Sequence, residues 1–311
     1  MQALGALLGQ ENVMTDEPLA RHTSFRIGGP ADLFLTPEDE EALAGSLECL
    51  KAAGIPCFIM GNGTNLLVSD EGFRGAVIQI GKSMGRIEAG ENGLIAGAGA
   101  LLSRIAAAAL SQSLSGFEFA GGIPGSLGGA CIMNAGAYGG EMKDVLERVR
   151  VLTKEGEVKE LSRGEFSLGY RSSSFMKNEE IVLGADIRLH EGSRELIAAG
   201  MEELRKRRAE KQPIELPSAG STFKRPKGYF AGKLIMDSGL RGARVGGAMV
   251  SEKHCGFVVN VKDASAEDVL QLIMKVQKRV WETFGVQLEP EVRFLGEFHS
   301  FLPEGGKPCV L

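Results

Sequence analysis

The chain has 311 residues, of which 43% are hydrophobic and 24% are charged, so it is long enough to form more than one packed unit. No apolar run approaches the roughly 18 residues that cross a bilayer, and the formal net charge of −5 argues against a general nucleic-acid binder. We therefore expect neither a membrane nor a nucleic acid as partner. Residues 1–20 lack a basic start and predict an amphipathic helix rather than a signal peptide, so we expect a cytoplasmic location.

The cysteines and histidines show no pattern of a metal site. Five cysteines and four histidines are scattered along the chain, with no C-x-x-C and no H-E-x-x-H spacing. We therefore expect reduced thiols and no catalytic metal. The basic run Arg205–Arg208 falls on a helical pattern, which predicts a solvated helix face.

Hydrophobic spacing and capping signals predict alternating helices and strands up to residue 212. In chain order, the predicted elements are a helix over 37–53 after Thr36, strands over 57–60, 76–80, 86–89 and 94–96, an alanine-rich helix over 101–112, a hairpin of 145–153 with 157–161, a strand over 181–189 and a helix over 193–211.

Pro213 ends that last helix, and the sequence then becomes irregular, so we place a domain boundary after residue 212. The predicted elements beyond it are a helix over 233–237, short strands near 248–250 and 256–260, and a long helix over 265–284 that Gly285 closes. The overall prediction is an α+β fold with units 1–80, 81–212 and 213–296, followed by a tail over 297–311 with little regular structure.

Two glycine-rich segments, residues 61–65 (GNGTN) and 116–141, are the most informative feature of the chain. Glycine lets backbone N–H groups face an anion with no side chain in the way. The first segment does not fit a Rossmann fingerprint, because Leu66 stands where that motif requires glycine. Residues 81–83 (GKS) end like a P-loop, but Ala76 stands where the P-loop requires its first glycine. Two such turns could hold a pyrophosphate from both sides, although two tight loops without a ligand remain an alternative.

Polar residues in three further places suggest a reaction site. Arg171 lies between an aromatic residue and a serine run, a setting that suits it to clamp a carboxylate with its planar guanidinium. Ser221 offers a hydroxyl, with Lys224 and Arg225 as positive charge for a phosphate, and Glu291 precedes a short predicted strand. Each also has a structural interpretation: an arginine paired with a surface acid, a polar loop and a surface carboxylate.

Taken together and in order, nine segments resemble the UDP-N-acetylenolpyruvoylglucosamine reductase family. They include HTSFRIGGPAD (22–32), GNGTNLLVSD (61–70), GYRSSSF (169–175), LPSAGSTFKRP (216–226) and LEPEVRFLGE (288–297), and they cover nearly the whole chain. The resemblance implies an FAD enzyme with NADPH as hydride donor. Its substrate would be the small molecule UDP-N-acetylglucosamine enolpyruvate, reduced to UDP-N-acetylmuramate for peptidoglycan synthesis.

The resemblance also implies the fold and the roles of residues. Units 1–80 and 81–212 resemble the two parts of an FAD-binding domain of the PCMH/vanillyl-alcohol-oxidase type, and unit 213–296 a smaller α+β substrate-binding domain. The implied catalytic residues are Arg171, the proton donor Ser221 and Glu291. The residues expected around FAD are Gly61, Asn62, Gly63, Thr64, Asn65, Gly121, Gly122, Ile123, Pro124, Gly125, Ser126, Gly128, Gly129, Asn134, Ala135 and Gly136. Those expected around the substrate are Tyr170, Lys224, Arg225, Lys233 and Arg293.

The chain departs from the longer family form in one place. Only residues 176–180 separate GYRSSSF from the next predicted strand, so there is no room for the loop that carries a substrate-covering tyrosine. The chain therefore resembles the shorter, type II variant. Glu291 would lie beside a developing negative charge, so we expect it to be either protonated or paired with a cation such as Arg293.

Two other functions remain open on the sequence alone. One is a PCMH-type FAD oxidase or dehydrogenase acting on an alcohol donor, in which Cys131 would be the one cysteine of the glycine-rich segments able to tether the flavin. The other is a non-catalytic nucleotide-sugar-binding protein. The sequence does not determine the oligomeric state, and we expect a monomer.

Overall fold

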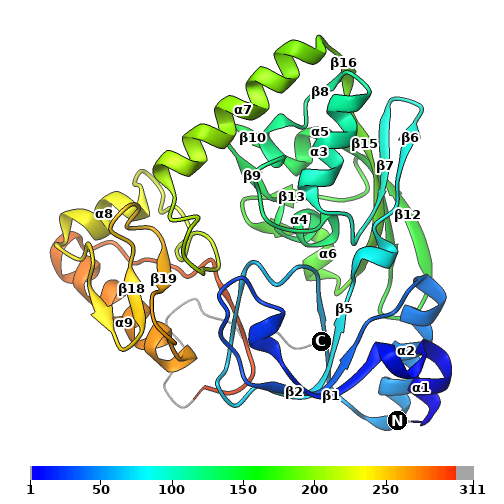
Figure 1. Ribbon diagram of the computed structural model, residues 1–311, viewed down its shortest axis with the longest axis horizontal. Coiled ribbons are helices and arrows are strands. Elements are labelled where there is room, and N and C mark those ends of the chain that lie inside the picture. The colour runs from blue at the N-terminus through cyan, green and yellow to red at the C-terminus, as the bar shows by residue number, and fades with distance from the viewer. Residues whose placement is uncertain (1, 299–311) are drawn as a thin grey trace.

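The first unit is a small sheet with two helices on one face (Figure 1). The computed structural model of the protein describes residues 2–298. Its sheet has the order β1-β2-β5-β3, in which β2, β5 and β3 run parallel and β1 is antiparallel to β2. The elements are α1 (Gln2–Leu8), β1 (Val13–Pro18), β2 (Pro30–Leu35), α2 (Glu40–Ala53), β3 (Cys57–Met60) and β5 (Phe73–Gln79), with short 3-10 turns at Gln10–Asn12 and Leu19–Arg21.

Alternation along β2 explains how this sheet is buried on both faces. Leu33 and Leu35 belong to the core that includes the helices α1 and α2, whereas Phe34 belongs to a separate cluster on the other face. The predicted N-terminal helix was wrong beyond Leu8, where the chain turns and enters β1. The helix predicted over 37–53 begins at Glu40, because the Asp39 side chain accepts the Ala42 N–H at 2.8 Å and caps the helix in place of Thr36.

The second unit is a five-stranded antiparallel sheet with the order β12-β11-β15-β7-β6. Its main elements are β6 (Ile87–Gly90), β7 (Gly93–Gly97), α3 (Leu102–Ser111), α4 (Leu127–Met133), β11 (Leu146–Leu152), β12 (Val158–Ser162), β15 (Ile181–Arg188) and α7 (Arg194–Lys211). Its shorter elements are η3 (Lys82–Met84), β8 (Leu114–Ser115), η4 (Glu118–Ala120), β9 (Gly136–Ala137), β10 (Gly140–Glu141), α5 (Met142–Val145), β13 (Leu168–Gly169), β14 (Ser172–Ser173), α6 (Ser174–Lys177) and β16 (His190–Glu191). The predicted hairpin of β11 with β12 is confirmed.

The third unit packs helices against a three-stranded sheet, in the order β17-β18-β19. Its elements are α8 (Ala231–Asp237), β17 (Arg244–Val245), β18 (Ala248–Val250), β19 (Val258–Asn260) and α9 (Ala266–Phe284). Ser265 caps α9, and Gly285 ends the helix in a left-handed conformation, as predicted for Gly285. Asp70 of the first unit also accepts the Ala266 N–H at 2.8 Å, so an acid from another unit stabilises the start of this helix.

After α9 the chain returns to the first unit. β20 (Arg293–Leu295) pairs in parallel with β4 (Leu66–Val68), the strand that directly follows the GNGTN turn. Phe294 and Leu295 are completely buried there. This pairing places the segment that carries Glu291 beside the first glycine-rich turn.

Within residues 2–298, no helix is both long and apolar enough to cross a bilayer. The same residues contain no group of three or more His, Cys, Asp or Glu side chains that could hold a metal ion. The tail predicted over 297–311 lies outside the described residues except for its first two positions.

Candidate active site

The two glycine-rich segments face each other across the boundary between the first and second units. A Cβ atom added to Gly61 would lie only 2.3 Å from Ser126 Oγ and 4.0 Å from the Gly129 nitrogen. A Cβ atom added to Gly125 would lie 3.5 Å from Thr64 Oγ1. The loops therefore approach closely because glycine is present, as the two-sided arrangement predicted from the sequence requires.

One polar group between these loops has no partner within the protein. Ser126 is 3% exposed, and among the described residues its Oγ makes no hydrogen bond. The position where Gly129 would carry a Cβ has no atom within 4 Å. A buried hydroxyl without a partner is costly, and an oxygen of a bound pyrophosphate would satisfy it. The residues present thus fit the cofactor that the sequence resemblance implies.

The first loop is held in a conformation that requires glycine. Gly63 has φ 60°, and a Cβ atom there would lie 2.0 Å from the His22 carbonyl oxygen. Asn65 connects this loop to the segment that carries Glu291. Its side-chain amide donates to the Glu291 carbonyl at 3.1 Å, and its own carbonyl accepts the Arg293 N–H at 3.0 Å. Asn62 is exposed on the same turn.

Asn134 has its side chain engaged inside the protein. It is 1% exposed, and its amide nitrogen donates to Glu141 at 2.7 Å and to the Gly169 carbonyl at 3.0 Å. The structure therefore shows Asn134 supporting the β13–β14 hairpin that carries Arg171. Two other glycines of this segment also pack against protein atoms: Gly128 against Ala98, and Gly136 against the adjoining strand β10.

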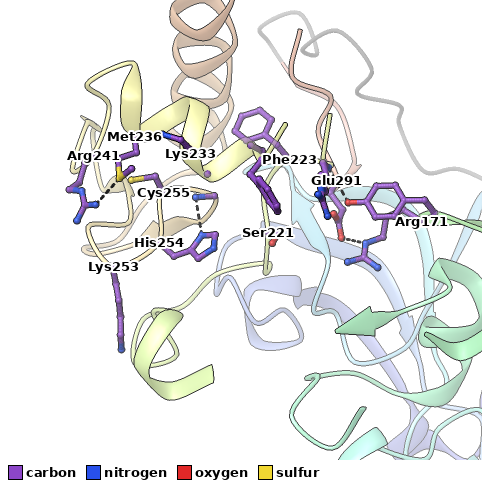
Figure 2. A pocket seen from close by; sticks show the side chains of 16 residues that line it. Arg171, Ser221, Phe223, Lys233, Met236, Arg241, Lys253, His254, Cys255 and Glu291 are labelled. Atoms are coloured by element: carbon purple, nitrogen blue, oxygen red, sulfur yellow. Dashed lines mark hydrogen bonds and ion pairs between the residues drawn. The ribbon is translucent and has the colours of Figure 1, made fainter. Parts of the chain in front are cut away.

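A pocket of about 390 Å³ lies between the second and third units and brings together the three predicted catalytic residues. Figure 2 shows Arg171 and Glu291 at one end, Arg241 at the other and Ser221 between them. The full lining is Tyr170, Arg171, Ser221, Phe223, Arg225, Phe230, Ala231, Gly232, Lys233, Met236, Arg241, Lys253, His254, Cys255, Gly256 and Glu291.

Backbone pairing brings Ser221 and Glu291 to the same place. The Glu291 N–H donates to the Thr222 carbonyl at 2.8 Å, and Phe223 forms an antiparallel bridge with Pro290. Thr222 is buried, and its Oγ1 accepts the Val258 N–H at 2.9 Å. Hydrogen bonds of Thr222 therefore join three chain segments, around residues 221, 257 and 290.

Arg171 occupies the turn of the β13–β14 hairpin with φ 52°, a left-handed conformation that is uncommon for a residue other than glycine. Its Nε donates to Glu291 Oε1 at 2.5 Å, and the two side chains are 20% and 11% exposed. The pair uses the Nε–H, so the two terminal amino groups of the guanidinium are not engaged by it.

Burial raises the pKa of Glu291, while the charges of Arg171 and Lys224 oppose this shift. The expectation that Glu291 pairs with a cation is met, but the cation is Arg171. The suggested partner Arg293 instead places its Nη1 at 3.2 Å from Met176 Sδ. Neither Arg293 nor Lys224 lines the pocket, and Lys224 forms an ion pair with Glu289.

The other predicted substrate residues do line the pocket. The Arg225 guanidinium lies 4.0 Å above the Phe230 ring, and the Arg225 backbone N–H donates to the Tyr170 hydroxyl at 3.0 Å. Lys233 pairs with Asp237 at 2.6 Å. The pocket thus combines several cations with a stacking surface.

The pocket residues that were not predicted as site residues include Phe230, Arg241, Lys253 and His254. His254 Nδ1 accepts the Gly256 N–H at 3.1 Å, and burial lowers the pKa of its imidazole, which keeps the ring neutral with its proton on Nε2. Arg241 and His254 fall within segments that carried the family resemblance, which was the one signal that could have indicated them.

Cys131 lies in the core, as the sequence suggested. It is completely buried, and burial raises the pKa of its thiol to about 12. A buried, protonated thiol is inert, which removes the cysteine considered above for a covalent flavin link.

The two facing loops fit a nucleotide cofactor, and comparison with known proteins defines the chain as an FAD-dependent oxidoreductase. Residues 31–162 match the family model described as FAD binding domain. Residues 212–295 match the model described as UDP-N-acetylenolpyruvoylglucosamine reductase, C-terminal domain. The chain belongs to the UDP-N-acetylenolpyruvoylglucosamine reductase family.

Full-length relatives support this membership. The chain is 54% identical over 303 residues to the UDP-N-acetylenolpyruvoylglucosamine reductase of Agathobacter rectalis, covering 94% of this chain and 96% of the relative. It is 51% identical over 291 residues to that of Clostridioides difficile, covering 94% and 96%. The crystal structure of the reductase from Thermus caldophilus superposes with a TM-score of 0.76 at 38% identity, covering 91% of this chain and 97% of the other.

Proposed function

We propose that the protein uses NADPH to reduce the enolpyruvyl group of UDP-N-acetylglucosamine enolpyruvate to UDP-N-acetylmuramate, a step of peptidoglycan synthesis. The observation that carries the proposal is the convergence of Arg171, Ser221 and Glu291, from three distant segments, in one pocket. We further propose the division into FAD-binding parts 1–80 and 81–212 and a substrate domain 213–296. From the resemblance alone, we propose a cytoplasmic monomer.

Bound FAD supplies the hydride chemistry, with NADPH as the source of reducing equivalents. The backbones of residues 61–65 and 121–129 would hold its pyrophosphate, with Ser126 Oγ as one further donor. Among the described residues, Ser126 Oγ is a buried hydroxyl that makes no hydrogen bond.

Arg171 is proposed to bind the carboxylate of the enolpyruvyl group. Reduction of the double bond drives negative charge towards that carboxylate, and a guanidinium remains protonated throughout and can form two parallel hydrogen bonds. Because Glu291 engages only Nε, the terminal amino groups of Arg171 can form this fork.

Glu291 is proposed to fix the orientation of Arg171. A second full negative charge beside the substrate would be repulsive, and the raised pKa of Glu291 reduces that cost. The sequence left open whether Glu291 is protonated or paired with a cation. In this interpretation it is paired with Arg171, and burial also favours its protonated form.

Ser221 is proposed to give a proton to the carbon that carries the carboxylate. A serine hydroxyl is a weak acid, but the carbon that receives the proton is strongly basic after reduction of its neighbour. Ser221 lies between the Arg171–Glu291 pair and His254 (Figure 2), where it can reach a substrate held by Arg171.

The nucleotide part of the substrate is proposed to occupy the remainder of the pocket. Arg225 and Lys233 supply positive charge, Tyr170 holds the Arg225 backbone, and the Arg225–Phe230 stack offers a surface for a planar ring. Lys224 and Arg293 lie outside the lining, so we propose that they act through Glu289 and the backbone near Asn65.

The decisive experiment measures NADPH consumption by the purified protein. We expect a yellow protein that oxidises NADPH rapidly only when UDP-N-acetylglucosamine enolpyruvate is present, and a product heavier than the substrate by two hydrogen atoms in mass spectrometry. A protein whose flavin is reduced by alcohols and reoxidised by oxygen would contradict the proposal in favour of an oxidase. A colourless protein that binds the nucleotide sugar without turnover would indicate a non-catalytic binder.

A further inference from the structure

Helix α7 presents an arginine where its apolar stripe should continue. Ile197, Met201, Leu204 and Arg208 follow the i, i+4, i+7, i+11 spacing of one helix face. Ile197 is 4% exposed, and Met201 Cε would lie 3.3 Å from a Cβ atom on Gly121. Arg208 continues this contact, with its Cδ at 3.4 Å and its Nη1 at 3.6 Å from the corresponding position on Gly122.

Arg208 differs from the other residues of its basic run. Arg205, Lys206 and Arg207 are exposed and form ion pairs with acids one turn earlier on α7. The prediction of a solvated face was therefore wrong for Arg208, which is half-buried and turns towards the glycine-rich segment.

The charge of Arg208 is not neutralised by an acid within the described residues, where no carboxylate lies within ion-pair distance. Burial lowers the pKa of its guanidinium, and the nearby Tyr138 hydroxyl opposes that shift. A guanidinium does not lose its proton in a protein, and placing a charge away from water without a partner is costly. A negatively charged or electron-rich group from outside the chain would offset the cost of this partial burial.

We propose that Arg208 is an FAD-binding residue whose guanidinium contacts a negatively charged or electron-rich oxygen of the cofactor. Gly122, against which Arg208 packs, lies three residues before Gly125, which faces Thr64 of the other loop. The oxygen belongs either to the pyrophosphate or to the pyrimidine ring of the flavin, and both present the same chemistry to a guanidinium. The inference depends on FAD binding and not on which substrate the enzyme reduces.

The test compares Arg208→Met with Arg207→Met. Methionine at 208 continues the apolar stripe, so this variant should fold. Arg207 is an exposed neighbour that forms an ion pair with Glu203. FAD released on dilution of each purified holoenzyme is followed by flavin fluorescence. We expect the dissociation constant for FAD to rise about tenfold or more in R208M, as for the loss of a hydrogen bond to a charged group, and to change less than about twofold in R207M. Equal FAD affinity in the two variants would overturn the proposal.

Two further measurements separate a cofactor contact from a purely structural role. In the absence of FAD, R208M should melt at the same temperature as wild type or higher, because an unneutralised charge has been removed; a lower melting temperature without FAD would count against the proposal. A more negative midpoint potential of the bound flavin in R208M would assign the contact to the flavin ring, since a nearby positive charge stabilises the reduced form. Weaker binding at an unchanged potential would assign it to the pyrophosphate.

Discussion

Replacing Thr222 by valine tests whether the junction beneath the catalytic residues controls their position. Valine keeps the shape of threonine but removes the oxygen that accepts the Val258 N–H at 2.9 Å. Thr222 and Val258 are 4% and 2% exposed, so water cannot replace the lost acceptor. An unpaired buried N–H costs about 1–3 kcal/mol. Thr222→Ser keeps the oxygen and loses one methyl group, which costs about 0.8 kcal/mol.

We therefore expect T222V to have a lower free energy of unfolding than T222S, measured by urea titration of the FAD-loaded proteins with far-UV circular dichroism. Because Thr222 directly follows Ser221 and accepts the Glu291 N–H, T222V should also slow reoxidation of the flavin by substrate more than its reduction by NADPH. Stopped-flow absorbance separates the two half-reactions. If T222V were as stable as T222S and reacted equally fast with substrate, the buried hydrogen bond would have no part in holding the site.

Three further predictions follow from the site and its loops. Ser221→Ala should leave flavin reduction by NADPH nearly intact and slow reoxidation by substrate about 10²- to 10⁴-fold in stopped-flow measurements; normal reoxidation would exclude Ser221 as proton donor. Because the pKa of Glu291 is raised by burial, the folded protein binds more protons than the unfolded chain between the usual and the raised value, so the free energy of unfolding falls as pH rises through that window. Urea titrations at a series of pH values should show this loss in wild type and not in Glu291→Gln, and parallel curves would contradict the raised pKa. Gly63→Ala should lose FAD during purification because its Cβ would overlap the His22 carbonyl, whereas Gly81→Ala, which has open space, should retain it; equal flavin content would refute the close approach.

Local signals were sufficient to predict most elements but not the ends that depend on distant contacts. The helices predicted over 193–211 and 265–284 begin within one residue of those positions, where Ser193 and Ser265 cap them. A cap is a local interaction between a side chain and the next turn. The start of α2 was misplaced because Thr36 and Asp39 are both plausible caps, and the sequence alone does not decide between them.

In the site, too, the features that depend on distant contacts could not be predicted from the sequence. Arg171, Ser221 and Glu291 were indicated by family resemblance, whereas the ion pair between the first and last requires the fold to bring together residues 120 positions apart. Arg208 was misjudged because the inward direction of one residue in a basic run depends on what α7 packs against. Sequence periodicity placed it on a helix, but only the position of Gly122 shows that its side chain is partly buried.

The way in which the chain closes explains why cofactor and catalytic residues are held together. β20 pairs with β4 directly after the first glycine-rich turn, so the segment bearing Glu291 is fixed to the loop that would hold the pyrophosphate. Asn65 strengthens this link with one bond to the Glu291 carbonyl and one from the Arg293 N–H. Glu291 in turn accepts a hydrogen bond from Arg171. A displacement of the loop would therefore move Glu291 and, with it, the Arg171 guanidinium. If Arg171 binds the substrate carboxylate as proposed, we expect FAD binding and alignment of that carboxylate to be coupled through Asn65.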